Sequence, residues 1–209
     1  MKYFYFLILL FLFAAPSYAD QKAITDTGEQ VILKSNGTWI YVDKTQKSDQ
    51  IIETNKIIFY KPQSSTFLIK STRNKSAFWI NPDKWKFNKT KINDASEYEF
   101  ELKGKDLYGI AITEGVEIPI ETLANIAFDN AKDHAPDMRI VKQEYRVVNG
   151  KKLIYMEMVG TVKNINITYY GYYYSTSAGS TQFVAYTVTN AGSRYGSDII
   201  DFLNGLDMQ

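Results

Sequence analysis

Cysteine is absent from the 209-residue chain, and histidine occurs once, at His134. The absence of cysteine excludes disulfides, thiol catalysis, redox function and thiolate metal sites. A lone histidine at the predicted C-terminal end of a helix could be a catalytic base or a ligand. Its position is more typical of a cation that complements the helix dipole. Because disulfides are excluded, the stability of the fold must come from side-chain packing, which suits the 15% aromatic content.

Sequence motifs that carry chemistry are also lacking. There is no G-x-S-x-G turn, no glycine-rich phosphate loop and no D-x-D-x-D-G calcium loop. The stretch DNAKDHAPD gathers Asp129, Asp133, His134 and Asp137. It could bind a hard metal ion, but a solvated helix end is the favoured interpretation. The sequence therefore predicts no catalytic residue, no metal and no other cofactor.

The chain has no large excess of either positive or negative charge. The chain has 24 basic and 23 acidic side chains, so its formal net charge is +1 at pH 7. A protein that binds nucleic acid through its phosphates normally carries a clear basic excess. We therefore expect no nucleic-acid partner.

The first 19 residues have the features of a secretory signal peptide. Lys2 precedes an apolar run from Phe4 to Ala15, and Ser17 and Ala19 are small residues in the positions that a signal peptidase reads. The run is shorter than the roughly 20 apolar residues that span a bilayer. We expect cleavage after Ala19, export to the periplasm or the medium of a bacterium, and no stable membrane anchor afterwards.

The mature chain divides into three parts. Residues 20–42 predict a β-hairpin around Asn36-Gly37, with a third short strand as an alternative. The stretch DTGEQVILKSNGTWIYV within it resembles a segment found near the start of many exported bacterial proteins. Residues 43–63 are polar and predict a linker. Residues 64–209 predict a single domain.

The domain at 64–209 alternates strand and helix patterns. Strands and hairpin turns, including Asn149-Gly150 and Ala178-Gly179, surround one amphipathic segment that begins at Pro119 and ends before Pro136. A second helix is expected in SDIIDFLNGL near the end of the chain. These patterns predict an α+β fold with an antiparallel sheet of about six to seven strands and two main helices packed on it.

The order of these elements resembles the PsbP-like and DcrB-like fold over residues 65–206. The resemblance rests on FWINPDKWKF at 78–87, a helix at 118–131, a strand pair through Asn149-Gly150 at 145–151, and a terminal helix at 198–206. It implies a central antiparallel sheet with helices packed across it. The group includes binding and assembly factors rather than one enzyme class, so the resemblance implies no activity.

The stretch TYYGYYY at 168–174 is the most aromatic part of the chain. Alternation along a strand places Tyr169, Gly171 and Tyr173 on the aliphatic face and the other tyrosines on the opposite face. With the neighbouring strand, the sequence predicts a contact patch that is suited to binding because tyrosine has a large apolar body and a polar tip. Its members are Tyr155, Tyr170, Tyr172 and Tyr174. The alternative is that a helix or the N-terminal hairpin covers this face.

These observations favour an exported, non-enzymatic binding or assembly module of the cell envelope. The expected partner is another envelope or secreted protein, or an apolar or aromatic small ligand. One alternative is a hydrolase that uses Glu97, Glu99 or Glu101, which alternation places about 6.6 Å apart on one strand face. Those residues could equally form a solvated strand face. A second alternative is a secreted factor that acts on a host or neighbouring cell.

Overall fold

The computed structural model describes residues 21–25, 30–35, 37–41, 52–89 and 95–208, and the chain divides into two compact units, within residues 1–44 and 45–209. The predicted signal peptide, the turn residue Asn36 and residues 43–51 of the predicted linker lie outside the described residues. We describe each unit by itself.

The N-terminal unit is a three-stranded antiparallel sheet, so the expected hairpin has a third strand. It consists of β1 (Gln21–Ile24), β2 (Gln30–Leu33) and β3 (Trp39–Tyr41), in that order. The turn before β3 is closed by the amide of Lys34, which donates to the carbonyl of Thr38 over 2.8 Å, and Gly37 adopts a φ of +80°. The rings of Trp39 and Tyr41 meet edge to face, with 5.0 Å between centroids, and both are exposed.

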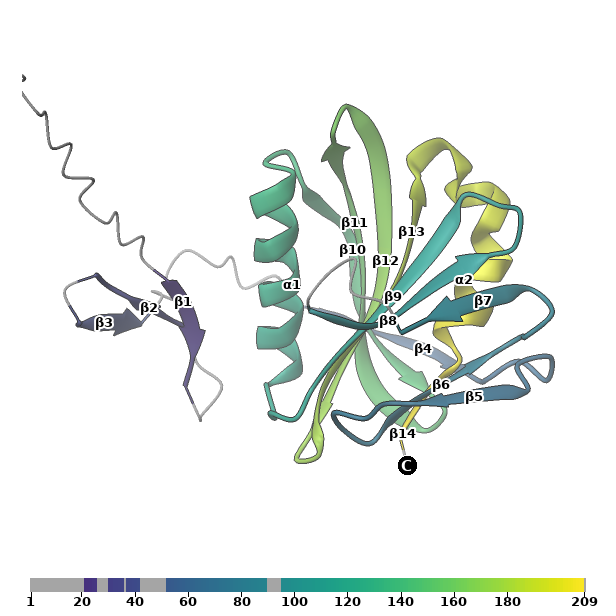
Figure 1. The fold of residues 1–209 in the computed structure, drawn as a ribbon, viewed down its shortest axis with the longest axis horizontal. Coiled ribbons are helices and arrows are strands. Elements are labelled where there is room, and N and C mark those ends of the chain that lie inside the picture. The colour runs from purple at the N-terminus through teal and green to yellow at the C-terminus, as the bar shows by residue number, and fades with distance from the viewer. Residues whose placement is uncertain (1–20, 26–29, 36, 42–51, 90–94, 209) are drawn as a thin grey trace, which may run out of the picture. The chain divides into compact units, whose positions relative to one another are not determined.

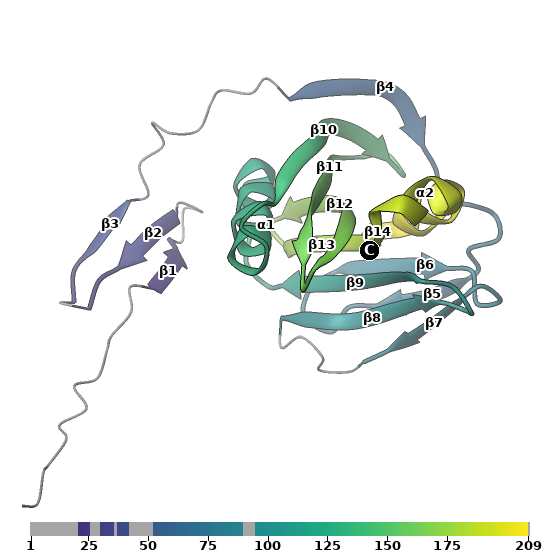
Figure 2. The same cartoon turned by 90° about the horizontal axis from the view of Figure 1, so that it is seen from above.

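The second unit is built on an eight-stranded sheet (Figures 1 and 2), one strand more than the upper expectation. The strand order is β4-β10-β11-β12-β13-β9-β8-β7, and every pair is antiparallel except β4 with β10. The strands are β4 (Glu53–Phe59), β7 (Trp85–Asn88), β8 (Ser96–Leu102), β9 (Leu107–Glu114), β10 (Arg139–Val148), β11 (Lys151–Val162), β12 (Ile165–Thr176) and β13 (Gly179–Val188).

Strand β4 is the element that the sequence did not predict. It lies within the segment 43–63, which we expected to be a linker, and it pairs in parallel with β10 at the edge of the sheet. Its side chains are mostly polar or exposed, because an edge strand held by backbone hydrogen bonds needs little apolar burial. The ordered unit therefore begins well before residue 64.

Two helices and a small second sheet cover the large sheet. Helix α1 (Ile120–His134) contacts β11, β12 and β13 on one face. On the other face lie η2 (Thr189–Tyr195), α2 (Gly196–Leu203) and a sheet of β14 (Leu206–Met208), β6 (Ser76–Ile80) and β5 (Phe67–Lys70). None of the helices in the described part of the chain is long and apolar enough to cross a membrane.

Alternation along the strands separates two hydrophobic cores. On the α2 face, Phe183 and Phe202 pack with 4.3 Å between ring centroids, and Phe78 completes the cluster. On the α1 face, aliphatic and methionine side chains of β11 pack with Tyr173 against the helix. The face assignment expected for strand 165–175 is therefore confirmed.

Gly171 is required by the packing of Tyr173. A Cβ atom at Gly171 would lie 2.6 Å from the hydroxyl oxygen of Tyr173 and 2.8 Å from its ring. Tyr173 is fully buried, so its ring has no space to move away. The glycine in TYYGYYY thus makes room for an aromatic side chain two residues further along the same face.

The predicted Asn149-Gly150 turn also joins distant parts of the unit. Both residues adopt positive φ angles, 50° and 78°, as a tight hairpin turn requires. The side-chain amide of Asn149 donates to the carbonyls of Asn204 and Leu206, each over 2.9 Å, and its oxygen accepts from the amide of Lys61 over 2.8 Å. One turn residue therefore holds the segment after β4 and the segment after α2.

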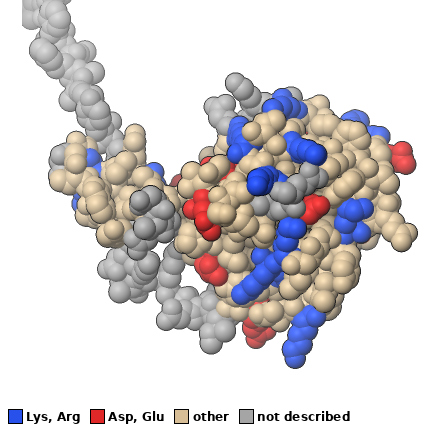
Figure 3. Space-filling model, turned by 90° about the horizontal axis from the view of Figure 1, so that it is seen from below, with Lys and Arg blue, Asp and Glu red and all other residues tan. Residues whose placement is uncertain are grey.

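Charged side chains on the surface are mixed. On the face of the molecule seen in Figure 3, lysine and arginine side chains lie in separate groups, with acidic and uncharged surface between them. This distribution agrees with the balanced charge of the sequence.

Candidate functional site

The four tyrosines of the predicted contact patch share a face, but that face is covered. Tyr155 and Tyr172 are paired across β11 and β12, and both belong to the core on the α2 side. Tyr170 and Tyr174 are half-buried at its margin, and η2 lies against the hydroxyl of Tyr170 at Gly192. The alternative of a covered face therefore holds for Tyr155 and Tyr172. A ligand contact by Tyr170 or Tyr174 stays a prediction.

Inside this face the aromatic rings surround a buried arginine. The guanidinium carbon of Arg146 lies 3.6 Å from the ring centroid of Tyr155 and 4.6 Å from that of Phe59. Its Nε donates to Oε1 of Glu144 over 2.6 Å, and one terminal nitrogen donates to the hydroxyl of Tyr172 over 3.2 Å. This arrangement could not be predicted from the sequence, because Arg146 is one of several charged residues in a strand of mixed polar and apolar side chains.

Electrostatics keep the groups around Arg146 in complementary protonation states. Burial would raise the pKa of Glu144, but hydrogen bonds from Asn55 and Arg146 lower it below its usual value. Burial raises the pKa of Tyr172, and the nearby guanidinium only partly opposes this. Tyr172 therefore remains a neutral hydroxyl that accepts from Arg146 and donates to Oδ1 of Asn204 over 2.9 Å.

Glu97 does not share a face with Glu99 and Glu101, which corrects the expectation from alternation. Ser96 pairs with Ile112 and Tyr98 with Ala111, so Glu97 is the extra residue of a β-bulge. Its buried carboxylate accepts hydrogen bonds from the Ser71 hydroxyl and from the amide and hydroxyl of Thr72, at 2.6 to 2.7 Å, and from Thr113. Burial acts to raise the pKa of Glu97, but these donors outweigh it and lower the pKa.

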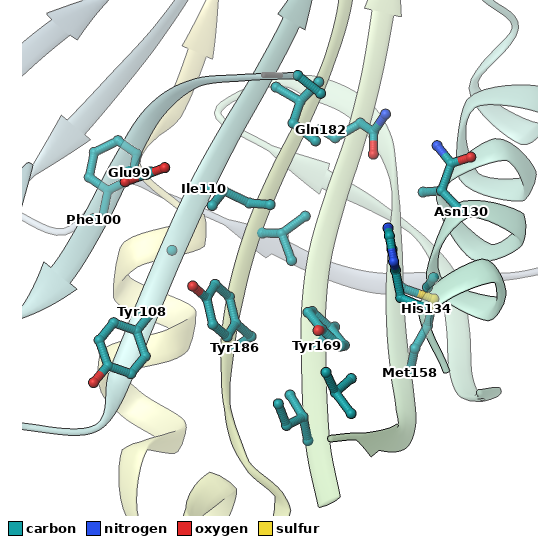
Figure 4. Close-up of a pocket in the computed structure, with 18 of the residues that line it drawn as sticks. Glu99, Phe100, Tyr108, Ile110, Asn130, His134, Met158, Tyr169, Gln182 and Tyr186 are labelled. Carbon is teal, nitrogen blue, oxygen red and sulfur yellow. The ribbon is translucent and has the colours of Figure 1, made fainter. Parts of the chain in front are cut away.

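The open part of the molecule is a groove on the α1 face of the large sheet (Figure 4). Its floor is formed by β8, β9, β12 and β13, and its wall by the C-terminal half of α1. The groove has a volume of about 780 Å³. It lies where the sheet extends beyond the helix that covers β11 to β13.

Three tyrosines cross the floor of the groove in one row. Tyr186 of β13 pairs in register with Tyr108 of β9 on one side and with Tyr169 of β12 on the other. Adjacent ring centroids are 5.6 Å apart in both pairs. Figure 4 shows the rings of Tyr108 and Tyr186 side by side, with their faces toward the viewer who looks into the groove. No hydrogen bond links their hydroxyls to the described residues of the chain.

Aliphatic side chains extend the floor, and polar side chains stand at its margin. Ile110, Val184 and Met158 lie between or beside the tyrosines, and Gln182, Asn130 and His134 project toward the same space (Figure 4). Burial raises the pKa of both Tyr169 and Tyr186, so their hydroxyls remain protonated donors at neutral pH. The arrangement suits an apolar or aromatic ligand with a polar group.

The row of groove tyrosines was not predicted, because Tyr169 was assigned to the core face and Tyr108 and Tyr186 were not assigned to either face. Tyr169 is followed by Tyr170, which points to the opposite face. Tyr108 and Tyr186 have small residues as their neighbours along the strand, in YGIAIT and FVAYT. The available signal was that three strands place a tyrosine on the same face. Alternation alone does not distinguish a covered face from an open one.

The acidic stretch at the end of α1 is divided between two environments. Asp133 and His134 line the groove, and α1 ends at His134 as expected. Asp137 instead accepts hydrogen bonds from the amide and hydroxyl of Thr161, over 2.9 and 2.7 Å. Within the described residues, no group of three or more histidine or acidic side chains is placed to hold a metal ion.

Comparison with known proteins establishes the fold and nothing finer. No family model matches the chain, and neither does any curated protein. The solution structure of cyanobacterial PsbP (CyanoP) from Synechocystis sp. PCC 6803 superposes with a TM-score of 0.52 at 13% sequence identity, over 71% of this chain and 95% of that one. LpqN, described as involved in cell envelope biogenesis of Mycobacterium tuberculosis, has a TM-score of 0.49 at 9% identity, over 68% of this chain and 90% of its own.

The expected PsbP-like fold is thereby confirmed, since CyanoP matches over nearly its whole length. An identity of 13% carries no argument about activity. The likeness to LpqN is too distant to add to the argument.

The first prediction concerns the buried arginine. Arg146→Ala should lower the free energy of unfolding by about 3–5 kcal/mol, because it leaves a buried carboxylate and a buried hydroxyl without their partner. Arg139→Ala, on the exposed part of the same strand, should change it by less than about 0.5 kcal/mol. Urea denaturation measures both, and equal effects would contradict the role given to Arg146.

The second prediction concerns pH. The folded-state pKa of Glu97 is lowered, so its contribution to stability is present above the unfolded pKa of about 4.3 and is lost as the pH falls through the folded pKa. Glu97→Gln should therefore destabilise the protein at neutral pH, and the difference from wild type should shrink on acidification. The exposed control Glu117→Gln should show no such trend. A difference that stays constant with pH would refute the assignment.

Proposed function

We propose that this protein is an exported, non-enzymatic binding module of a bacterial cell envelope, and that its ligand occupies the groove on the α1 face. One observation carries the proposal: a row of three tyrosines and several aliphatic side chains line a hollow of about 780 Å³ that no other described element covers. The volume falls in the range of about 300–1,000 Å³ that is usual for small-molecule sites.

The chemistry of the floor supports recognition of an apolar or aromatic body. Tyr108 is 38% exposed, and the faces of its ring and of Tyr186 look into the groove. Contact with a ligand would remove this apolar surface from water, and each tyrosine hydroxyl could still donate a hydrogen bond. Gln182 and Asn130 supply further donors and acceptors at the margin.

The geometry favours binding over carboxylate hydrolysis. Glu97 is held in the bulge by four hydrogen bonds, so it does not serve a reaction in the groove. Glu99 and Glu101 line the groove from the same strand. Two carboxylates that hydrolyse a glycoside flank the scissile bond from different sides, which two residues of one strand face do not.

The third prediction tests the groove with three naphthalene probes of similar size: 2-naphthylmethylamine, 2-naphthalenemethanol and 2-naphthoate. At least one should bind saturably and shift backbone amide resonances of β9, β12 and β13. Tyr186→Ala should weaken that binding by about fivefold or more, since stacking on one aromatic ring contributes about 1 kcal/mol or more. Nuclear magnetic resonance titration gives both the location and the affinity.

Tyr60→Ala is the matched control, because Tyr60 is exposed in the same unit but does not line the groove. This variant should bind the probes as the wild type does. The proposal fails if no probe binds saturably, or if the shifts map to strands outside the groove.

Export is proposed from residues 1–19. The fourth prediction is that the protein recovered from cells begins at Asp20, as N-terminal sequencing would report, and that it fractionates outside the cytoplasm. Recovery from the periplasm would favour a binding module of the cell envelope. Recovery from the medium would favour a secreted factor that acts on a host or neighbouring cell. A cytoplasmic protein that retains its first 19 residues would contradict export.

A further inference from the structure

Among the described residues that line the groove, the charged side chains are almost all acidic. Three carboxylates line it, from Glu99, Glu101 and Asp133. Apart from His134, no described residue that lines the groove is basic. The whole chain has one more basic side chain than acidic ones, so this bias belongs to the groove and not to the composition.

The end of α1 adds to the negative potential. The helix runs from Ile120 to His134, and residues of its last turn, Ala131, Asp133 and His134, form part of the groove wall. The C-terminal end of a helix carries a partial negative charge, because its last carbonyls point outward without helical partners. A cation in the groove would therefore be favoured by the helix and by the carboxylates together.

The aromatic floor of the groove is a third feature that would attract a cation. The rings of Tyr108 and Tyr186 present their faces to the groove (Figure 4), and the face of an aromatic ring is its electron-rich surface. A cation within about 6 Å of such a face is attracted to it. Glu101 pairs in register with Tyr108, and Glu99 lines the same groove, so both carboxylates lie on the strand next to the tyrosine row.

Lys86 and Lys89 of the outermost strand region are described, and neither lines the groove. Lys86 Nζ lies 3.4 Å from Oε1 of Glu101, with both side chains about half exposed. Such an exposed pair is weak and can exchange for a ligand. Lys89 instead donates to the hydroxyl of Thr72 and lies over the ring of Tyr98, toward the other face.

We propose that the ligand of the groove is a small organic cation, in which an amine or quaternary ammonium group is carried on an apolar or aromatic body. This inference rests on the proposed function of the groove and specifies its ligand class. The cationic group lies over the rings of Tyr108 and Tyr186, beside Glu99 and Glu101. The apolar body packs on the aliphatic floor toward Val184 and Tyr169.

The fifth prediction compares the affinities of the three naphthalene probes, which differ mainly in charge. The amine should bind about tenfold more tightly than the neutral alcohol, and the carboxylate should bind most weakly. Glu99→Gln/Glu101→Gln should reduce the preference for the amine over the alcohol to about threefold or less. Higher salt should also reduce it, because exposed charges are screened.

Two variants separate the groove from general electrostatics. Glu114→Gln/Glu117→Gln changes the net charge equally at exposed positions that do not line the groove, and it should leave the preference intact. Tyr186→Leu retains apolar volume but removes the ring face, so it should weaken the amine about threefold more than the alcohol. Unchanged amide spectra outside the groove verify that each variant is folded.

The outcomes distinguish the two levels of the proposal. If the alcohol or the carboxylate binds in the groove as tightly as the amine, the cation preference is wrong and the binding function stands. The preference is also wrong if the control double variant abolishes it as completely as the groove variant. If no probe binds, the proposed function fails, and the ligand class fails with it.

Discussion

A buried guanidinium needs both a counter-charge and several hydrogen-bond acceptors, and the α2 side of the sheet is arranged around that requirement. Arg146 on β10 meets a carboxylate on its own strand, a ring from β4, a ring from β11 and a hydroxyl from β12. The hydrogen-bond network extends from Arg146 through the hydroxyl of Tyr172 to the side chain of Asn204, which follows α2. Because each partner comes from a different element, this face can bury the charge only when all of them are in place. Two of the tyrosines in the predicted contact patch, Tyr155 and Tyr172, are thus buried in the interior.

The α1 face is partly open because the sheet is wider than the single helix that covers it. Eight strands at about 4.8 Å spacing make a sheet of roughly 34 Å, whereas a single helix is about 10 Å across. Helix α1 covers β11 to β13, and the floor of the groove continues from there across β9 to β8. A second helix on this side would have made the groove tyrosines ordinary core residues. The open groove is therefore a consequence of how few elements share the face, and the ligand class that we propose for it follows from its acidic margin.

Much of the fold could be predicted from local patterns. The strand alternation, the Asn149-Gly150 turn, the helix that ends at His134 and the order of elements all follow from side-chain period and turn chemistry. Strand β4 could not be found this way, because its first four residues are polar and its apolar residues, Ile57–Phe59, follow one another without alternation. Glu97 was misplaced because one unpaired residue in β8 reverses the alternation before it. For the site, the sequence predicted tyrosine contacts on the α2 face, which stay a prediction for Tyr170 and Tyr174. The burial of Tyr155 and Tyr172 could not be predicted, since the coverage of a face depends on elements far away in the chain.

The second unit cannot complete its fold before residues 204–208 are available, because Asn149 and strand β6 both bind this segment. Strand β14 pairs with β6, about 130 residues earlier, and Asn149 holds the carbonyls of Asn204 and Leu206. Contacts that join such distant segments form slowly and late. During synthesis the α2 face stays unfinished until residues 204–208 have left the ribosome. The α2 face is therefore the last part of the unit that can be completed while the chain is being made.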